Sequence, residues 1–124
     1  KWLIKMPHLR LEHTIEISAN ATSDLFKKLV DILTDNTTIQ SSNCKSRAIK
    51  IKNHHMGSKN HDDFIHLDII LLEGRNNDVK QKIGEKALDL LKSYFQKTSN
   101  DNIPQISLEI REMKQNNYFT TNSI

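Results

Sequence analysis

The order of apolar periodicities along the chain limits the fold more than any other feature. A stretch of alternating apolar and polar residues, typical of a half-buried strand, precedes a stretch with helical spacing and then a second alternating stretch. The same order occurs again in the second half of the chain, as a degenerate internal repeat. Two strand–helix–strand units predict a four-stranded sheet with both helices on one face, which is a two-layer α+β domain.

The first unit begins with a strand in which Leu9 and Leu11 alternate with Arg10 and Glu12, and Ile15 and Ile17 would extend it. An amphipathic helix of about three turns is expected next, with Thr22 or Ser23 as its N-cap. The apolar face of this helix consists of Leu25, Phe26, Leu29, Val30 and Leu33. This face would pack on the sheet.

The second strand is expected over residues 44–52, with Ile49 and Ile51 on one face. After a polar connector, residues 64–72 form the most apolar run and are the best candidate for a central strand. Asn76 is placed to cap the second helix. The apolar stripe of that helix is Val79, Ile83, Ala87, Leu90, Leu91, Tyr94 and Phe95, and a last strand alternates through Ile106, Leu108 and Ile110.

The size of the chain predicts one domain with a small core. Its 124 residues are near the usual domain size. The apolar fraction of 36% is below the average of about 45–50% for globular domains. Two helices cover one face of the predicted sheet, and Ile, Leu and Phe side chains are expected on the other face. A partner subunit is the expected cover for that second face.

The charge balance narrows the class of partner. A net charge of +3 and a pI of about 9.0 permit anionic ligands without requiring nucleic acid. The predicted central strand shows Ile, Leu and Asp where an RNA-binding sheet would display stacking aromatic residues, which disfavours a ferredoxin-like nucleic-acid module. Cys44 is the only cysteine, so an internal disulfide is excluded and a reducing, cytoplasmic compartment is expected. No stretch approaches the roughly 20 apolar residues of a membrane span.

Strand order would bring basic residues and a proline to one edge of the sheet. A helical crossover makes the first two strands parallel, so Pro7 and the pair Lys45 and Arg47 would start at the same edge. The third strand should run the opposite way and end there, at Gly74 and Arg75. Arginine offers a planar fork to carboxylates and lysine a point charge. This edge is therefore a candidate anion site, and the alternative is a set of ordinary solvated strand ends.

Other kinds of site find little support in the sequence. The histidines His54, His55, His61 and His66 follow no metal-ligand spacing, and three of them lie in a polar connector. We therefore expect solvated histidines and no metal site. A Gly-rich phosphate loop, a serine nucleophile elbow and a paired-carboxylate signature are all missing from the sequence.

Pro7 stands out because proline has a secondary amine when it begins a chain. Met6 precedes it, and methionine before a small residue is commonly removed. If the functional chain begins at Pro7, its amine would titrate near about 7.7–8.0, close enough to neutrality to act as a general base. Residues 1–6 would then be an N-terminal extension or a cloning remnant, and residues 7–124 a single domain. With residues 1–6 attached, the nitrogen is an amide without basicity.

Five short motifs occur in an order and spacing that carry a family resemblance. They are Pro7-His8-Leu9, Lys45-Ser46-Arg47, Asp63-Phe64-Ile65-His66, Gly74-Arg75 and Ser107-Leu108-Glu109-Ile110-Arg111-Glu112. Together they look like the 5-carboxymethyl-2-hydroxymuconate isomerase family of the tautomerase superfamily, which also contains 4-oxalocrotonate tautomerase and macrophage migration inhibitory factor. The resemblance runs from Pro7 to about Phe119. Lys45 stands where the family run reads Arg.

This resemblance implies a tautomerase/MIF-like homotrimer and a cofactor-independent isomerase. Pro7 would be the catalytic general base of a 1,3-proton shift from enol to keto. Lys45, Arg47 and Arg75 would bind an anionic small molecule, an unsaturated 2-hydroxy or 2-oxo polycarboxylate such as 5-carboxymethyl-2-hydroxymuconate. Neither nucleic acid nor a membrane is implied as a partner. The alternative is a non-catalytic trimeric binding protein that retains the fold, which the residues before Pro7 and the replacement at Lys45 both favour.

Overall fold

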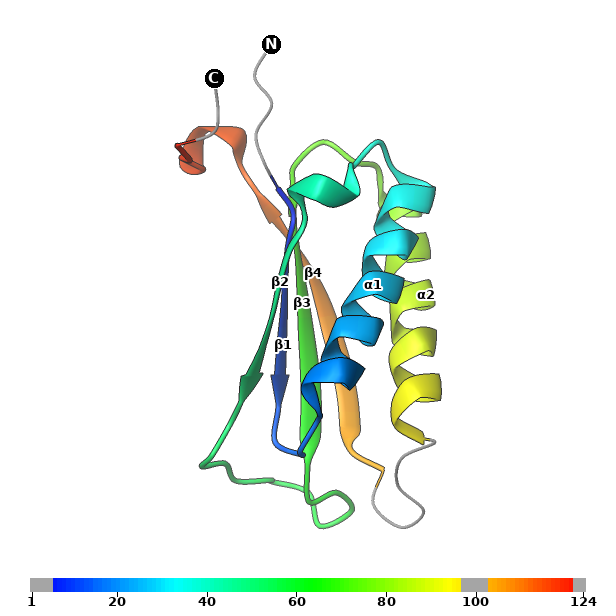
Figure 1. Cartoon of the computed structure of the whole chain (residues 1–124), viewed down its shortest axis with the longest axis vertical. Coiled ribbons are helices and arrows are strands. Elements are labelled where there is room, and N and C mark those ends of the chain that lie inside the picture. Colours follow the sequence, from blue (N-terminus) through cyan, green and yellow to red (C-terminus); the bar gives the residue numbers. More distant parts are fainter. Residues whose placement is uncertain (1–5, 97–102, 122–124) are drawn as a thin grey trace.

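The computed structural model describes residues 6–96 and 103–121. The strands are β1 (His8–His13), β2 (Lys45–Lys50), β3 (Phe64–Leu72) and β4 (Gln105–Met113), the helices are α1 (Ala19–Asn36) and α2 (Asn77–Gln96), and two short 3-10 helices are η1 (Ser41–Asn43) and η2 (Gln115–Asn117) (Figure 1). Residues 1–5 of the expected N-terminal extension, residues 97–102 of the loop before Pro104, and residues 122–124 lie outside the described residues.

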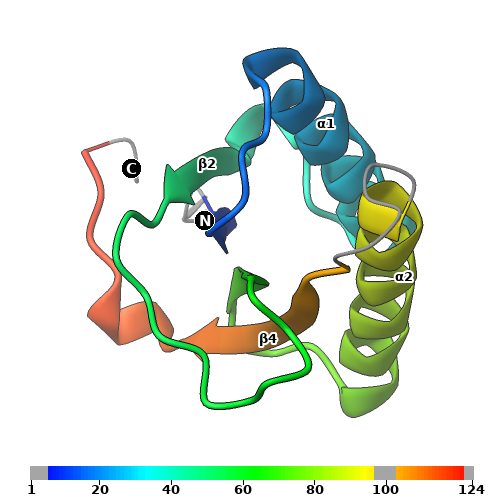
Figure 2. The ribbon, with the colours of Figure 1, turned by 90° about the horizontal axis from the view of Figure 1, so that it is seen from below.

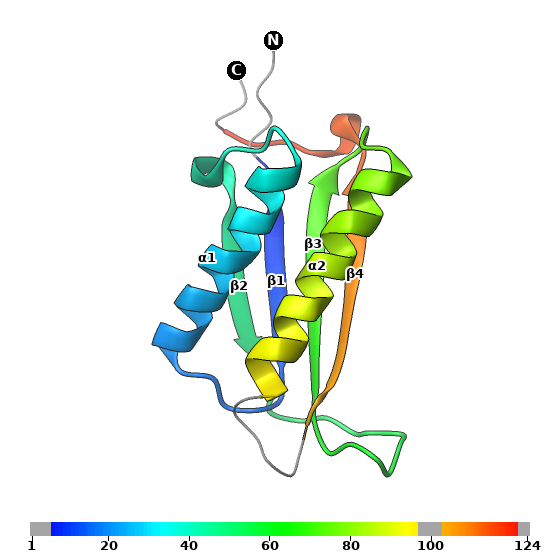
Figure 3. The ribbon, with the colours of Figure 1, turned by 90° about the vertical axis from the view of Figure 1, so that its right-hand side faces the viewer.

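The strands form one sheet in the order β2-β1-β3-β4. β1 pairs parallel with β2 and antiparallel with β3, and β3 pairs parallel with β4. Both helices lie on the same face of this sheet (Figure 3). The predicted α+β class, the parallel first pair and the reversed third strand are therefore confirmed.

β3 is a central strand, and its bounds match the predicted run over residues 64–72. The side chains that it turns toward the helices are fully buried, and they are Ile65, Leu67, Ile69 and Leu71. Leu9 and Leu11 of β1 join them. The helices contribute Leu25, Leu29, Leu33, Ile83, Ala87, Leu91 and Phe95 to the same core. Because fully burying one such large side chain stabilises the fold by about 1.5–3 kcal/mol, this layer holds the helices on the sheet.

Helix α1 begins earlier than the sequence pattern indicated. Its N-cap is Ser18, whose Oγ accepts the backbone N–H of Ala21 at 3.1 Å. The prediction of Thr22 or Ser23 as the cap is wrong, because the Thr22 hydroxyl donates back to the carbonyl of Ala19 at 2.9 Å, a bond made inside a helix. The helix has 18 residues, about five turns rather than three. Among the described residues, neither this helix nor α2 is long and apolar enough to cross a bilayer.

β1 ends at His13, so its predicted extension through Ile15 and Ile17 is wrong. The hydroxyl of Thr14 donates to Asp63 Oδ1 at 2.7 Å, and His13 Nδ1 lies 2.7 Å from the carbonyl oxygen of Ile15. These contacts accompany the bend that follows β1. Ile15 and Ile17 instead pack against the core from the connection to α1.

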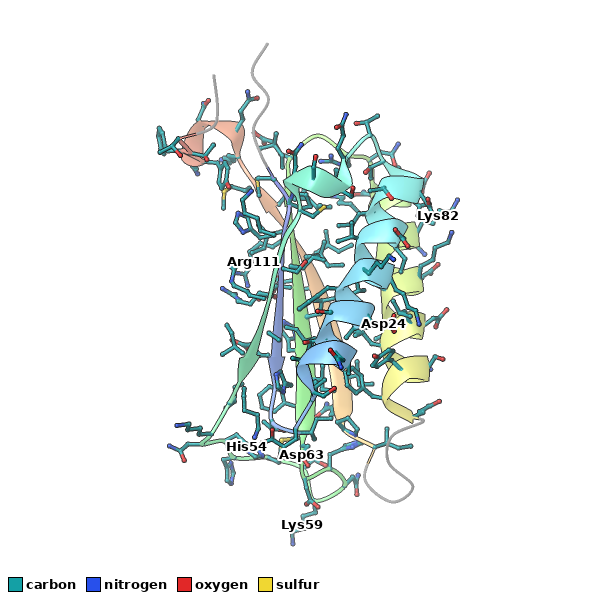
Figure 4. All side chains as sticks on the ribbon, viewed as in Figure 1. Asp24, His54, Lys59, Asp63, Lys82 and Arg111 are labelled. Carbon is teal, nitrogen blue, oxygen red and sulfur yellow. The ribbon has the colours of Figure 1, made fainter. Side chains whose placement is uncertain are left out.

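The face of the sheet away from the helices, here called the open face, is mostly polar. Its middle is occupied by Arg10, His66, Asp68, Glu109 and Arg111, and Figure 4 shows Arg111 on this side. Apolar side chains of β3 flank this charged middle at Phe64, Ile70 and Leu72. On the edge strand β2 every residue is exposed, and Ile49 keeps 41% of its surface in solvent while Ile51 is partly covered. The Ile, Leu and Phe side chains expected on this face are therefore present, and they flank a polar centre.

Candidate active site

A pocket of about 270 Å³ lies at the end of the sheet where β1 begins and β3 ends. Pro7 and Arg75 both line it, as the strand order predicted. The remaining lining comes from Met6, from the segment between α1 and β2, and from the end of β3: Thr38, Ile39, Gln40, Ser42, Asn43, Leu71 and Leu72. Leucine side chains, neutral hydroxyl and amide groups and one guanidinium make this lining suitable for a small molecule that carries an anionic group.

Pro7 is held in place by the start of the β1–β2 ladder. Its carbonyl accepts the backbone N–H of Lys45 at 3.1 Å, and the residue itself is fully buried. Met6, only 6% exposed, precedes it and also lines the pocket. In this form the Pro7 nitrogen is an amide, which has neither a proton nor basicity. It therefore cannot accept a proton while Met6 is attached.

Arg75 reaches the pocket through a tight turn after β3. Gly74 has a φ of 121°, a region that side-chain-bearing residues rarely adopt. The Arg75 Nη1 donates to the carbonyl of Leu72 at 2.9 Å. A guanidinium has five N–H donors, so the same group can also serve a carboxylate. Asn76 follows, and its Oδ1 accepts the N–H of Val79 at 2.9 Å, which confirms the predicted cap of α2.

The other two predicted cations lie outside the pocket lining of their own chain. Lys45 is next to it, because its Nζ donates to the carbonyl of Asn43 at 3.3 Å and Asn43 lines the pocket. Arg47 lies on the open face, where its Nη1 is 3.1 Å from Nδ1 of His8. One chain thus brings together Pro7 and Arg75 but holds Arg47 on the other side of the sheet.

A contact that the sequence analysis missed joins His8 to the C-terminal segment. His8 Nε2 lies 3.0 Å from the Tyr118 hydroxyl, and the two rings meet edge to face at 5.9 Å between centroids. Figure 2 shows the C-terminal segment on the side of the sheet away from the helices. Burial, followed by the charges of Arg47 and Lys45, lowers the pKa of His8 below 6.5. Strand alternation indicates that His8 shares a face with Arg47, but the Asn-rich tail has no period that would place Tyr118.

The charged middle of the open face is an ion-pair network. Asp68 is 3% exposed and accepts hydrogen bonds from Arg10 at 2.6 Å and from His66 at 3.0 Å, and Arg111 lies 3.9 Å away. Burial raises the pKa of this carboxyl, but the bonds from Arg10 and His66 outweigh it and hold the pKa below 3.8. Ligand atoms of His66, Asp68 and Glu109 lie within 4.8 Å of one another. The guanidinium groups beside Asp68 repel a metal cation, so this geometry favours ion pairing.

The histidines of the connector after β2 do not form a site among the described residues. His54 Nε2 lies 2.9 Å from the carbonyl oxygen of Asp62, and His61 Nδ1 lies 3.1 Å from that of Ile103. Figure 4 places His54 at the end of the sheet opposite the start of β1. These contacts join neighbouring loop segments to one another.

Comparisons with solved structures identify the fold. A 5-carboxymethyl-2-hydroxymuconate isomerase from Deinococcus radiodurans R1 superposes with a TM-score of 0.79 at 22% identity, covering 93% of this chain and 88% of the other. A macrophage migration inhibitory factor-like protein from Entamoeba histolytica gives a TM-score of 0.68 at 14% identity, over 94% and 97%. A protein described as a fused 4-OT, wild type, symmetric trimer gives 0.76 at 12% identity, over 95% and 96%. A search of curated proteins finds no match.

The sheet order, the two helices on one face and the pocket at the start of β1 define a tautomerase/MIF-like protein. A family model of 5-carboxymethyl-2-hydroxymuconate isomerase matches residues 7–124. The chain therefore belongs to the 5-carboxymethyl-2-hydroxymuconate isomerase family, as its sequence motifs indicated.

Proposed function

We propose that this protein is a cofactor-independent isomerase that converts the enol of an unsaturated 2-hydroxy acid to its keto form, with Pro7 as general base. The observation that carries the proposal is that Pro7 and Arg75 line one pocket in a chain of an isomerase family. The substrate class would be a polycarboxylate such as 5-carboxymethyl-2-hydroxymuconate. The catalytically active form of the chain would begin at Pro7, because only then is the Pro7 nitrogen a secondary amine.

The reaction would be a 1,3-proton shift that consumes no cofactor. The Pro7 amine would take the proton of the enol hydroxyl, and the electrons of that O–H bond would form the carbonyl double bond. The electrons of the carbon–carbon double bond would take the proton back from the Pro7 ammonium, at the carbon two atoms from the oxygen. Arg75 would stabilise the negative charge that develops on the oxygen during the transfer. Leu71 and Leu72 would restrict water near the reacting atoms.

A second carboxylate of the substrate would meet Lys45, which lies beside the pocket of its own chain, and Arg47 from a neighbouring copy in a homotrimer. Arg47 lies outside the pocket lining of its own chain, and β2, which carries both residues, is an edge strand with every residue exposed. A closed ring of three copies would place the edge strand of one copy near the pocket of the next. The basic edge would then be shared between subunits.

The test compares two matched preparations of equal oligomeric state, one beginning at Pro7 and one at Lys1. An enolised 2-oxo acid serves as the substrate, and loss of the enol absorbance is followed. General-base catalysis typically supplies about 10²–10⁴-fold, which sets the expected advantage of the shorter chain. Pro7→Ala in the shorter chain keeps a primary amine and should lose only part of the activity. Equal rates for the long and short chains would mean that Pro7 is not the base.

Mixed oligomers test the shared site. The chain beginning at Lys1 lacks a basic Pro7 nitrogen, and Arg47→Ala in the chain beginning at Pro7 lacks the second cation. Each alone should be weakly active. Random assembly of the two in a ring would give about a quarter of the sites both a free Pro7 and an intact Arg47 from a neighbour. Activity that recovers on mixing supports the shared site, and activity that stays at the level of the separate variants contradicts it.

A non-catalytic binding protein is the second candidate. The amide between Met6 and Pro7 and the position of Met6 in the pocket lining favour it. In this case both chain lengths should bind a dicarboxylate, measured by calorimetry, and neither should accelerate enol loss. Catalysis by either form excludes this candidate.

A further inference from the structure

His8 occupies a position on the open face between two polar side chains from distant parts of the chain. Arg47 Nη1 lies 3.1 Å from its Nδ1, and the Tyr118 hydroxyl lies 3.0 Å from its Nε2. The first partner comes from β2 and the second from the segment after η2. Both ring nitrogens therefore have a partner at hydrogen-bond distance.

The identity of the partners fixes the protonation state of the ring. A guanidinium carries only donors, so Arg47 can bond to Nδ1 only if that nitrogen has a free lone pair. The proton of a neutral imidazole then resides on Nε2, which donates it to the Tyr118 oxygen. Protonation of Nδ1 would remove the acceptor and place two positive charges in contact. Both contacts are compatible with one form only, neutral His8 with its proton on Nε2.

We propose that His8 is a positioning residue for Arg47, holding its guanidinium in the orientation in which it meets the anionic group of a 2-oxo dicarboxylate. The inference rests on the proposed function in one respect, the role of Arg47 as a substrate-binding cation. Arg47 is a long exposed side chain whose ordering costs rotamer entropy on binding, and a fixed acceptor removes part of that cost beforehand. Tyr118 in turn fixes the ring of His8.

The surroundings of His8 keep the ring neutral. The groups that face it are Lys45 and Arg47 on β2, Arg10 two residues along β1, Ile70 at the paired position of β3, and Tyr118. Within residues 6–96 and 103–121, these neighbours include cations and no carboxylate. Burial and the charges of Arg47 and Lys45 lower the pKa of His8, so the acceptor at Nδ1 persists at neutral pH.

The first experiment measures the protonation state of the His8 ring directly. In the full chain with ¹⁵N-labelled histidine, long-range proton–nitrogen NMR spectra at pH 7 should show His8 with the proton on Nε2; the His8→Asn variant assigns its signal. Arg47→Ala removes a nearby charge, so the pKa of His8 should rise toward 6.5. Tyr118→Phe should leave the proton on Nε2. A proton on Nδ1, a charged ring at pH 7, or no change of pKa in Arg47→Ala overturns the proposal.

The second experiment measures binding of 2-oxoglutarate, a 2-oxo dicarboxylate that needs no proton transfer, by calorimetry. His8→Ala and Arg47→Ala should each weaken binding about tenfold. The double variant should bind no more weakly than either single variant, because each substitution removes the same guanidinium of Arg47 held by His8. His8→Asn retains an acceptor near the Nδ1 position and should restore most of the affinity. His66→Ala, a histidine on the same face without contact to Arg47, is the matched control and should bind like the parent chain.

The outcomes separate this proposal from the isomerase proposal. If the chain beginning at Pro7 catalyses no enol loss, the isomerase proposal is refuted. Equal and non-additive losses of binding in the same chain would still support the role of His8. Additive losses, unchanged binding in Arg47→Ala, or no difference between His8→Asn and His8→Ala would refute the role of His8 whatever the turnover.

Discussion

Arg10 of β1 donates a hydrogen bond of 2.6 Å to Asp68 of β3 on the face of the sheet that the helices leave uncovered. The carboxylate is 3% exposed, although it lies on this open face. His66 and Arg111 lie on the other side of the same carboxylate, so four charged or titratable groups from three strands meet there. This network occupies the centre of the face, between the apolar side chains Phe64 and Ile70 of β3.

The network should make stability depend on pH. The pKa of Asp68 is below 3.8 in the folded protein, so the unfolded chain binds more protons as the pH falls through this range. The contribution of Asp68 to the free energy of unfolding is fully present above about pH 4, the pKa of the unfolded state. It is lost as the pH falls through the pKa of the folded state. Asp68→Asn should therefore lower the free energy of unfolding at pH 7 by about 3 kcal/mol, the cost of breaking a largely buried pair.

Urea unfolding at fixed protein concentration, at pH 7 and at pH 3, measures this effect. The difference between parent and variant should shrink at pH 3. Glu109→Gln, an exposed neighbour in the same network, is the control and should change stability by less than about 1 kcal/mol. A difference that is equally large at both pH values would show that the charge of Asp68 is not its source.

The protein should be a trimer in solution. β2 is an edge strand whose six residues are all exposed, among them Ile49 with 41% of its surface in solvent. An exposed edge of this kind is expected to be covered by another chain. Sedimentation equilibrium should give roughly three times the chain mass of 14.4 kDa. A stable monomer at micromolar concentration would also remove the proposed sharing of Arg47 between subunits.

Arg75→Ala should impair turnover of a dicarboxylate enol far more than a change at an exposed cation elsewhere. A hydrogen bond to a charged group contributes about 1.5–3 kcal/mol, so kcat/KM should fall about 10–100-fold. Lys82→Ala is the matched control, because Lys82 is exposed on α2 and Figure 4 shows it on the side of the helix away from the sheet. Similar small effects of both changes would mean that Arg75 is an ordinary solvated residue.

Lys45→Arg should lower KM for a dicarboxylate or leave it unchanged. Lys45 lies beside the pocket through its bond to the Asn43 carbonyl, and an arginine fork can bind a carboxylate through two hydrogen bonds where lysine provides a point charge. Steady-state kinetics of the chain beginning at Pro7 measures the change. Lys50→Arg, on the same strand but paired with Glu16, is the control and should not alter KM. A clear rise of KM in Lys45→Arg alone would contradict a binding role for this position.

Sequence patterns predicted the elements whose signals are local and strong. The apolar run over residues 64–72 became β3 with the expected bounds, and Asn76 caps α2 through a bond three residues away. The approach of Pro7 to Arg75 was also predictable, because a helical crossover makes the first two strands parallel and the third strand returns beside them. Where the local signal is weak, as at the start of α1, the sequence pattern predicted the wrong residue. The sequence does not single out Ser18 as the cap of α1, because Thr22 and Ser23 carry the same kind of side chain.

The sequence by itself thus determined the order of the strands and helices, the layer that holds the core, and the end of the sheet at which Pro7 and Arg75 lie. Arg10 and Asp68 face each other on the open face, away from the helices. Only the tertiary structure decided which polar groups pair there, because the partners of Asp68 come from three strands and the partner of His8, Tyr118, from a tail without periodicity. Such pairings depend on register and on the packing of side chains that are far apart in the chain, and no local pattern encodes them.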